Sequence, residues 1–296
     1  MNKTSVEASV ISIVIVNYNG LQYTKKCIES LFRFHISELL EVIVVDNNSS
    51  DGSQTELPKL FPSIIFLSLY ENRGFGAANN AGAKKAKGEF LFFVNNDTLF
   101  LEETITGLKN ILLSQTKCGI VSPKLLNEDR TFQLSFGEFP SIRSEFGAMK
   151  MAKDSSLQAK EEVVSKRPIK KDWTTGAAIM IKRKLFESVG GFDELFFMYF
   201  EDIDLCKAVN KKGYDVFYIP TISLIHFGGK SYEKNNSRIL FEYRHSQLRY
   251  YDKHNSLFQR ITLRVYLILK LLPIMLKKTD RMLSTSILKL VFSRHF

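Results

Sequence analysis

Residues 11–20 read Ile-Ser-Ile-Val-Ile-Val-Asn-Tyr-Asn-Gly, a β-branched run that ends in a polar turn. Three further apolar runs follow at residues 41–45, 64–69 and 90–94, with helix-period segments between them. Apolar runs that alternate with helical patterns are typical of a parallel sheet buried on both faces. The sequence therefore predicts an α/β fold, with helices flanking a mostly parallel sheet.

Polar residues follow each apolar run, and we expect them to lie along one edge of the sheet. Asn17 and Tyr18 follow the first run, Asp46 the second, Arg73 the third and Asp97 the fourth. In open α/β sheets, ligands bind outside the carboxyl ends of the strands. This edge is therefore the predicted binding site.

Composition excludes several classes of protein. The 296 residues are 45% hydrophobic and 24% charged, which argues against a disordered, collagen-like or disulfide-scaffold chain. Cys27, Cys118 and Cys206 are odd in number and lack metal-ligand spacing, so we expect reduced, mostly buried thiols in a cytoplasmic protein. The apolar segment 10–16 is too short for a secretory core.

The net charge of +10 is concentrated near the C-terminus, because residues 238–296 alone carry +9. There the basic residues interleave with long apolar side chains, which favours an anionic membrane surface over nucleic acid. The apolar run 261–276 is interrupted by Arg264, Lys270 and Pro273, and it is shorter than the roughly 20 residues of a spanning helix. We predict a domain over residues 1–236 and a helical extension over 237–296 that contacts the inner face of the membrane peripherally. A helical pair packed on the domain is the alternative.

Two acidic segments are candidates for chemistry. Asp97 ends the segment Asn95-Asn-Asp97, where a carboxylate could bind a divalent cation, or could cap a helix before residues 101–103. Residues 200–204, Phe-Glu-Asp-Ile-Asp, place three acids in a first helical turn, as the helix dipole alone would favour. Residues 196–200, Phe-Phe-Met-Tyr-Phe, would hold one acid beside an apolar wall, where it could act as a general base.

Three other features each have two interpretations. Asp46 is consistent with turn chemistry or with binding the imide N–H of a pyrimidine base. Residues 74–79 resemble a dinucleotide fingerprint, but Asn79 replaces the third glycine, so helix packing or a phosphate near Arg73 are alternatives. His226, which precedes Gly-Gly, is either structural or a ligand for phosphate or metal.

Six segments in this order together resemble glycosyltransferase family 2 and are most similar to its rhamnosyltransferase-like branch, which builds bacterial cell-surface polysaccharides. They are Ser12-Ile-Val-Ile-Val-Asn-Tyr-Asn19, Val45-Asp-Asn-Asn-Ser-Ser-Asp-Gly52, Asn72-Arg-Gly-Phe-Gly-Ala-Ala-Asn79, Asn95-Asn-Asp97, Thr175-Gly-Ala-Ala178 and Phe200-Glu-Asp202. The resemblance covers about residues 10–232. It implies a Rossmann-like GT-A fold and an inverting transfer from a nucleoside-diphosphate sugar.

The resemblance also implies roles for individual residues. Val16, Tyr18 and Asp46 would hold the nucleobase, and Arg73, Asn79 and Asn96 would lie on the donor side. Asp97 and His226 would bind Mg²⁺ or Mn²⁺, Asp202 beside Glu201 would deprotonate the acceptor, and Trp173, Thr175, Gly176 and Ala177 would shape the acceptor side. Asp97 and Asp202 must then face one cleft. Asn95 stands where the family pattern often has Asp, which removes one acid from the metal site.

The leading hypothesis is a membrane-associated glycosyltransferase that uses dTDP-rhamnose and a glycan or lipid-linked acceptor in cell-wall polysaccharide synthesis. A nucleotidyltransferase acting on sugar phosphates is a rival, although no glycine-rich basic loop lies near the start of the chain. A non-catalytic nucleotide-sugar binder is the third hypothesis. No nucleic-acid partner is expected, and a homodimer is left open.

Overall fold

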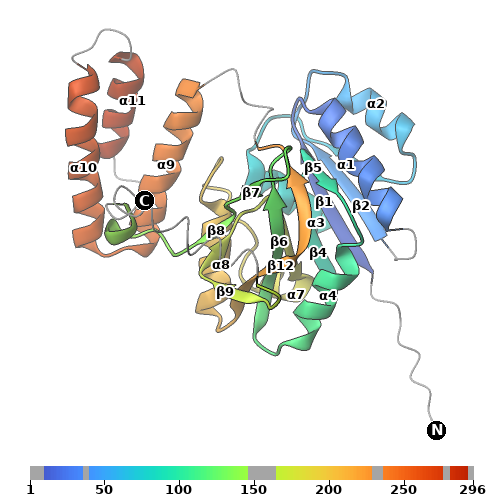
Figure 1. The fold of residues 1–296 in the computed structure, drawn as a ribbon. Helices are drawn as coiled ribbons and strands as arrows, with labels where there is room; N and C mark the ends of the chain where they lie inside the picture. Colours follow the sequence, from blue (N-terminus) through green and yellow to red (C-terminus); the bar gives the residue numbers. More distant parts are fainter. Residues whose placement is uncertain (1–9, 36–39, 146–164, 229–235, 276–280, 293–296) are drawn as a thin grey trace.

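The computed structural model describes residues 10–35, 40–145, 165–228, 236–275 and 281–292. A ten-stranded sheet lies at its centre, with a small two-stranded sheet beside it (Figure 1). The strands of the main path are, in spatial order, β3 (Ile65–Ser68), β2 (Leu40–Asp46), β1 (Ile11–Asn17), β4 (Phe90–Asn95), β11 (Ala178–Lys182), β6 (Cys118–Leu126), β12 (Asp215–His226) and β5 (Thr98–Phe100). Two further strands, β7 (Phe132–Gln133) and β9 (Ile169–Lys171), pair with β6 and β12, and β8 (Phe136–Gly137) pairs with β10 (Trp173–Thr174).

The four predicted strands form the parallel half of the sheet, as the sequence indicates. β1 pairs in parallel with both β2 and β4, and β2 pairs in parallel with β3. β11 then runs antiparallel between β4 and β6, and β12 returns parallel to β6. The mostly parallel α/β fold is confirmed.

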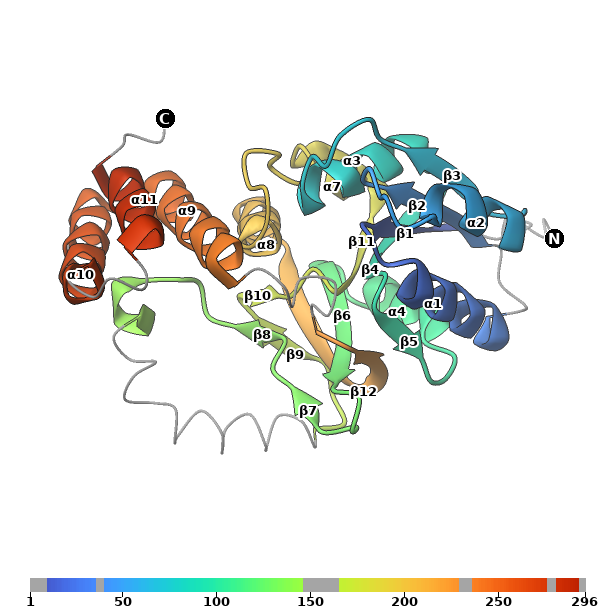
Figure 2. The same ribbon diagram turned by 90° about the horizontal axis from the view of Figure 1, so that it is seen from above.

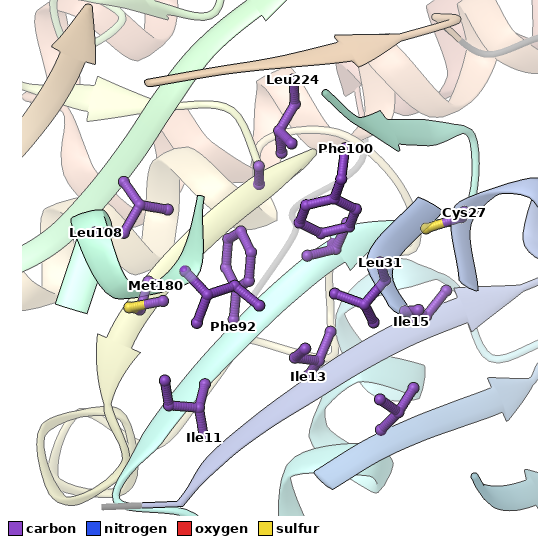
Figure 3. Close-up of a cluster of buried hydrophobic side chains, with 14 of the residues drawn as sticks. Ile11, Ile13, Ile15, Cys27, Leu31, Phe92, Phe100, Leu108, Met180 and Leu224 are labelled. Carbon is purple, nitrogen blue, oxygen red and sulfur yellow. The ribbon is translucent and has the colours of Figure 1, made fainter. Parts of the chain in front are cut away.

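Helices cover both faces of the sheet. Ile11, Ile13 and Ile15 of β1 point toward α1 (Leu21–Phe34) and α4 (Ile105–Ser114), whose Leu31 and Leu108 complete that cluster (Figure 3). Alternate residues such as Val14 face the other side, where they pack with α3 (Phe75–Lys85), α7 (Arg183–Ser188) and α8 (Glu201–Lys211). A short helix α2 (Ser53–Leu60) packs beside α1 and against β3, with Leu57 buried in the same cluster. This two-sided burial explains why successive residues of these strands, and not only alternate ones, are mostly apolar.

Three C-terminal helices form the predicted helical extension: α9 (Asn236–His254), α10 (Leu257–Met275) and α11 (Arg281–Phe292). Figure 2 shows them grouped beside α8, with α9 next to it. Phe200 and Ile203 pack with Leu248 and Tyr251 of α9 and with Leu263 of α10 in a third buried cluster. The extension is thus joined to the start of α8 by an apolar core.

Some local expectations differ from the structure. Strand β5 follows Asp97 and no helix begins before Ile105, because residues 98–100 pair with Leu224–His226 of β12. Strand β12 runs through Pro220, and an irregularity in its pairing with β6 between Ile219 and Ser223 accommodates that segment. Residues 124–171 contain the end of β6 and three short strands, while residues 146–164 lie outside the described part.

The three cysteines are free and buried, as expected. Burial raises the pKa of each thiol to about 12, so they are unreactive at neutral pH. Across the described residues, no helix is both apolar enough and long enough to cross a bilayer.

Candidate functional site

A cavity of about 790 Å³ lies at the carboxyl ends of β1 and β4. Asp97, from the turn after β4, and Asp202, from the first turn of α8, both line it. Other predicted residues that line the cavity are Val16, Tyr18, Asn96, Trp173, Thr175, Gly176, Ala177, Glu201 and His226. The structure therefore brings most of the candidate residues together, although 105 positions separate the two aspartates.

The loop at residues 175–177 connects the two acidic sides of the cavity. The Asn95 amide N–H donates to the Ala177 carbonyl oxygen at 2.9 Å, which ties this loop to the end of β4. The Gly176 N–H donates to Asp202 Oδ2 at 2.8 Å, and the Ile203 N–H donates to Oδ1 at 2.8 Å. Each oxygen of Asp202 is thus held by one backbone donor, which fixes the carboxylate at the cavity wall.

Burial governs the electrostatics of the acidic pair on α8. Removal from water raises the pKa of Asp202, against the opposing effect of the N–H groups that it accepts. Burial and the neighbouring charge of Asp202 raise the pKa of Glu201 well above its ordinary value. Glu201 is only 6% exposed, and its Oε2 has no hydrogen-bond partner among the described residues. A carboxylate with a raised pKa in a cavity is suited to accepting a proton.

Replacing Glu201 by glutamine should stabilise the protein near pH 8. The folded state holds a proton on Glu201 more tightly than the unfolded state does, so wild-type stability falls as pH rises above the ordinary glutamate pKa. Glutamine cannot ionise, so the variant does not lose stability in this way. Its free energy of unfolding near pH 8 should be about 1 kcal/mol higher than that of wild type. Urea unfolding at several pH values measures the effect. A gain that does not shrink at acidic pH would contradict the electrostatic explanation.

Two residues directly before this acidic pair adopt a costly backbone conformation. Tyr199 and Phe200 have φ angles of 68° and 66°, a region that costs non-glycine residues about 1–2 kcal/mol each. The loop in front of them is anchored by Phe75, whose N–H donates to the Phe197 carbonyl oxygen at 2.9 Å. Gly74 permits this contact, because a Cβ at that position would lie 2.2 Å from the same oxygen. The loop that precedes the acids is therefore held against the turn before α3.

Helix α9 holds the other side of the same loop. Ser246 Oγ donates to the Met198 carbonyl oxygen, and Arg249 donates to that of Leu195, both at 2.8 Å. One turn further, Lys253 donates to Asp193 at 2.7 Å and to Asp204 of α8 at 2.9 Å. Tyr243 of α9 lines the cavity itself. The first C-terminal helix thus forms part of the site, a role that nothing in its own sequence indicates.

The residues around Asp97 fit a divalent cation. Asp97 is 4% exposed, and its Oδ1 lies 3.2 Å from His226 Nε2. The two residues meet because the pairing of β12 with β5 places His226 opposite Thr98, the residue after Asp97. Asn95 Nδ2 lies 3.2 Å from the same ring nitrogen, while its Oδ1 is buried without a hydrogen-bond partner in the described part of the chain. No group of three His, Cys, Asp or Glu forms a complete metal site among the described residues. A cation here would take its other ligands from water or a bound diphosphate, as Mg²⁺ commonly does.

Among the described residues that line this cavity, none is a lysine or an arginine. A diphosphate placed beside Asp97 would therefore lack a protein cation from these residues. This charge distribution is a second reason why the site suits a metal ion.

Three predicted donor-side residues lie outside the described lining. Asp46 is fully buried and accepts from Asn17 Nδ2 at 2.7 Å and from Gln54 Nε2 at 2.9 Å. Arg73 pairs with Glu194 at 2.7 Å, and Asn79 donates to the Phe75 carbonyl oxygen of its own helix at 3.1 Å. Their hydrogen bonds in this structure hold loops and helices around the cavity.

Other lining residues were not predicted from the sequence. Asn47 lines the cavity and also accepts from the Arg73 N–H at 3.0 Å, so it links the turns after β2 and β3. Its place directly after Asp46 was a signal that could have identified it. Glu138, whose carbonyl oxygen accepts from the Trp173 ring N–H at 2.8 Å, and Glu145 also line the cavity, and no motif marks either one.

Comparison with known proteins identifies the family. Residues 12–190 match the family described as Glycosyl transferase family 2. The chain belongs to this family. It is a glycosyltransferase with the α/β GT-A fold, and its similarity to the rhamnosyltransferase-like branch is confirmed.

Curated relatives of this family 2 enzyme include an N-acetylglucosaminyl-diphospho-decaprenol L-rhamnosyltransferase of Mycobacterium tuberculosis. It is 25% identical over 97% of this chain and 99% of its own length. The rhamnosyltransferase WbbL of Escherichia coli is 26% identical over 74% of this chain and 83% of its own length.

Solved structures share the fold of this family 2 enzyme. The mannosyltransferase PcManGT of Pyrobaculum calidifontis, in complex with GDP-Man and Mn²⁺, matches with a TM-score of 0.58 and 16% identity. The match covers 97% of this chain and 86% of that one. GalNAc-T7 with UDP, GalNAc and Mn²⁺ matches with a TM-score of 0.62 and 15% identity, over 83% of this chain and 48% of that one.

Proposed function

We propose that this enzyme is an inverting glycosyltransferase that moves rhamnose from dTDP-rhamnose to a glycan or lipid-linked acceptor in cell-surface polysaccharide synthesis. The observation that carries the proposal is that Asp97 and Asp202 line one cavity at the edge of the sheet where α/β proteins bind ligands. The choice of sugar and acceptor is supported by the mycobacterial relative, whose name specifies rhamnosyl transfer to a lipid-linked acceptor.

Asp202 is the proposed base. Its carboxylate would accept the proton of an acceptor hydroxyl as that oxygen attacks the anomeric carbon of the donor sugar. The bond from that carbon to the diphosphate oxygen breaks, and the electron pair leaves with the nucleoside diphosphate. Attack opposite the leaving group inverts the anomeric centre. The two backbone N–H groups on Asp202 support this role because they orient the carboxylate before substrate binds.

Asp97 and His226 are the proposed protein ligands of Mg²⁺ or Mn²⁺. A bound cation would stabilise the charge that develops on the departing diphosphate. The absence of lysine and arginine from the described lining supports this requirement, as does the presence of Mn²⁺ in two structural relatives. The protein's part is to hold one carboxylate oxygen and one ring nitrogen 3.2 Å apart at the donor end of the cavity.

The remaining predicted residues have proposed roles on the two sides of the cavity. Val16, Tyr18 and Asn96 would contact the nucleotide, while Asp46, Arg73 and Asn79 would order the donor-side turns around it. Trp173 and residues 175–177 would receive the acceptor, because they adjoin Asp202.

A donor screen tests the proposed function. The full chain is incubated with Mn²⁺, a panel of nucleotide sugars and a polyprenyl-diphosphate-linked acceptor, and nucleoside diphosphate release is measured. We expect release with dTDP-rhamnose that requires the acceptor. Pyrophosphate release from a nucleoside triphosphate would instead favour nucleotidyl transfer, and tight nucleotide binding without turnover of any donor would favour a binding protein.

Helix α10 supports the proposed contact with a membrane surface at the inner face of the cell membrane. Five large apolar side chains of this helix are 48–75% exposed: Leu257, Phe258, Ile261, Val265 and Leu269. Leu257, Ile261, Val265 and Leu269 follow one another at spacings of four residues, and Phe258 lies three residues before Ile261, so the five share one face. The opposite face is buried against α9 and α11. Arg260 and Arg264 lie at one edge of the stripe and share a single carboxylate, Asp252, which leaves positive charge beside it. An apolar stripe with a basic edge fits an anionic lipid surface.

Replacing Phe258 and Leu269 by glutamine should weaken binding to anionic vesicles by about tenfold or more, because two large apolar side chains would no longer enter the lipid interface. Flotation with phosphatidylglycerol vesicles measures this. The matched control is Leu113→Gln on α4, which is 52% exposed and far from the stripe. Equal flotation of all variants would contradict the proposal and favour an extension that only packs on the domain.

Substitutions on α10 test membrane binding more cleanly than truncation of the chain at residue 236 would. We propose that the division between residues 1–236 and 237–296 separates a catalytic domain from an extension with two roles. Helix α9 supports the site, whereas α10 provides the membrane face. Removing both together would confuse loss of membrane binding with damage to the loop before Asp202.

A further inference from the structure

Gln133 on β7 contacts the back of the His226 ring. Its Oε1 lies 2.7 Å from His226 Nδ1, on the opposite side of the ring from Asp97. Its Nε2 donates to Asn127 Oδ1 at 3.0 Å and to the His226 carbonyl oxygen at 3.3 Å. Gln133 does not line the cavity, and its hydrogen bonds connect it to the site through His226.

A chain of hydrogen bonds determines which way the Gln133 amide points. At its far end, Thr131 Oγ1 donates to Asp129 Oδ1 at 2.6 Å. Because its one proton is used there, Thr131 Oγ1 must accept from Asn127 Nδ2 at 2.9 Å. Asn127 therefore turns its Oδ1 toward Gln133.

The partners of Gln133 fix the orientation of its side-chain amide. Asn127 Oδ1 and the His226 carbonyl oxygen can only accept, so the amide NH₂ group must face both of them. Its oxygen is then left facing His226 Nδ1, which must carry a proton to donate to it. In neutral His226, the lone pair therefore lies on Nε2, the nitrogen next to Asp97.

This arrangement leaves Nε2 without a proton of its own while it lies 3.2 Å from a carboxylate oxygen. A lone pair and a carboxylate at this distance repel unless a positive charge is shared between them. The Asn95 amide at 3.2 Å supplies one donor to Nε2, and a divalent cation would satisfy both groups.

We propose that Gln133 is a positioning residue that holds the proton of His226 on Nδ1, so that Nε2 presents its lone pair to the cation bound with Asp97. This inference rests on the proposed function for the identity of the cation site. A residue outside the cavity would thus set the tautomer of His226 before the metal ion or the donor binds.

Two variants of Gln133 separate this role from simple packing. Gln133→Glu keeps an oxygen that accepts from Nδ1 but loses both donated bonds, whereas Gln133→Leu loses the acceptor as well. Mn²⁺ affinity is measured by electron paramagnetic resonance with full-length protein and dTDP present. We expect about 10–100-fold weaker Mn²⁺ binding for Gln133→Leu, as is typical when the partner of a ligating histidine is removed, and less than threefold change for Gln133→Glu.

Thr131→Ala is the matched control in the same turn. It removes the far end of the hydrogen-bond chain but leaves the His226 carbonyl oxygen to orient Gln133, so Mn²⁺ affinity should change less than twofold. Equal weakening by all three variants would overturn the proposal, because it would indicate a general disturbance of this turn. Unchanged affinity in Gln133→Leu would overturn it as well.

A second measurement distinguishes failure of this inference from failure of the proposed function. Nitrogen-15 shifts of the His226 ring in the metal-free protein report which nitrogen is protonated. We expect the Nδ1–H form in wild type and a shift toward Nε2–H in Gln133→Leu. An Nε2–H ring in wild type would overturn the inference even if the enzyme transfers sugar. The expected tautomer with no transfer from any donor would leave the role of Gln133 intact and contradict the proposed reaction.

Discussion

Replacing Asp202 by asparagine should lower kcat by about 10²–10⁴-fold while donor binding remains close to that of wild type. Asparagine can keep the hydrogen bond from Gly176 through its oxygen, but it cannot take a proton from the acceptor hydroxyl. Steady-state transfer and calorimetric titration with the nucleoside diphosphate measure the two quantities separately.

Asp204→Asn provides the contrast for this prediction. Asp204 lies two residues further along α8, but it pairs with Lys253 and with His254 of α9, at 2.9 Å and 2.6 Å. We expect this variant to lose stability, because it weakens a buried ion pair, and to keep turnover in the fraction that remains folded. If both variants lost turnover equally with intact folding, the assignment of the base to Asp202 would be wrong.

The pH profile gives an independent check on Asp202. A base must be deprotonated to act, so kcat/KM falls as pH drops through its pKa. Burial raises that pKa, and the limb should therefore lie above the ordinary range for aspartate. The charge of Asp202 raises the pKa of Glu201 well above its ordinary value, so Glu201 is still protonated when Asp202 titrates. Glutamine resembles protonated glutamate, so Glu201→Gln should leave this limb in place, and a limb that moved to lower pH would show that Glu201 is ionised when Asp202 titrates.

Replacing Asp97 by asparagine should abolish the gain in nucleotide affinity that Mn²⁺ gives to wild type, and should lower kcat by about 10²–10³-fold. The variant keeps the size of the side chain but removes the negative charge beside His226. The described residues that line the cavity include no lysine or arginine, so no basic side chain among them can take the place of Mn²⁺ beside the diphosphate. Titration of dTDP with and without Mn²⁺ measures the gain directly.

Glu187→Gln is a suitable control for Asp97→Asn, since it removes a carboxylate from the exposed surface of α7, where Glu187 pairs only weakly with Arg183. It should behave as wild type in both titrations. A Mn²⁺-dependent gain of wild-type size in Asp97→Asn would show that the cation is held elsewhere.

The sequence predicted the sheet because its strands are buried on both faces, as Ile13 and Val14 illustrate. Asp97 and Asp202 were predicted together because each follows a recognisable segment, and the order of strands then brings them to one cavity. Asp46 and Arg73 also lie at strand ends, yet their side chains turn to Asn17 and Glu194. That difference depends on loop conformation, which strand periodicity does not encode.

The contribution of α9 could not be predicted for a different reason. Tyr243 and Ser246 reach the loop before Asp202 from more than 40 positions further along the chain, through packing of one helix on another. Basic residues there indicated a membrane surface, but Lys253 pairs with Asp193 and Asp204, and Arg264 pairs with Asp252. Part of the positive charge of the extension therefore holds the protein together.

The central claim is that one cavity holds the cation and nucleotide at Asp97 and the base at Asp202. Crystals of the full chain grown with Mn²⁺ and dTDP test it through the anomalous signal of manganese. The account predicts a single strong peak within bonding distance of Asp97 and His226, with the diphosphate between this peak and Asp202. A nucleotide bound with its diphosphate away from Asp97, or a manganese peak at another site, would contradict it.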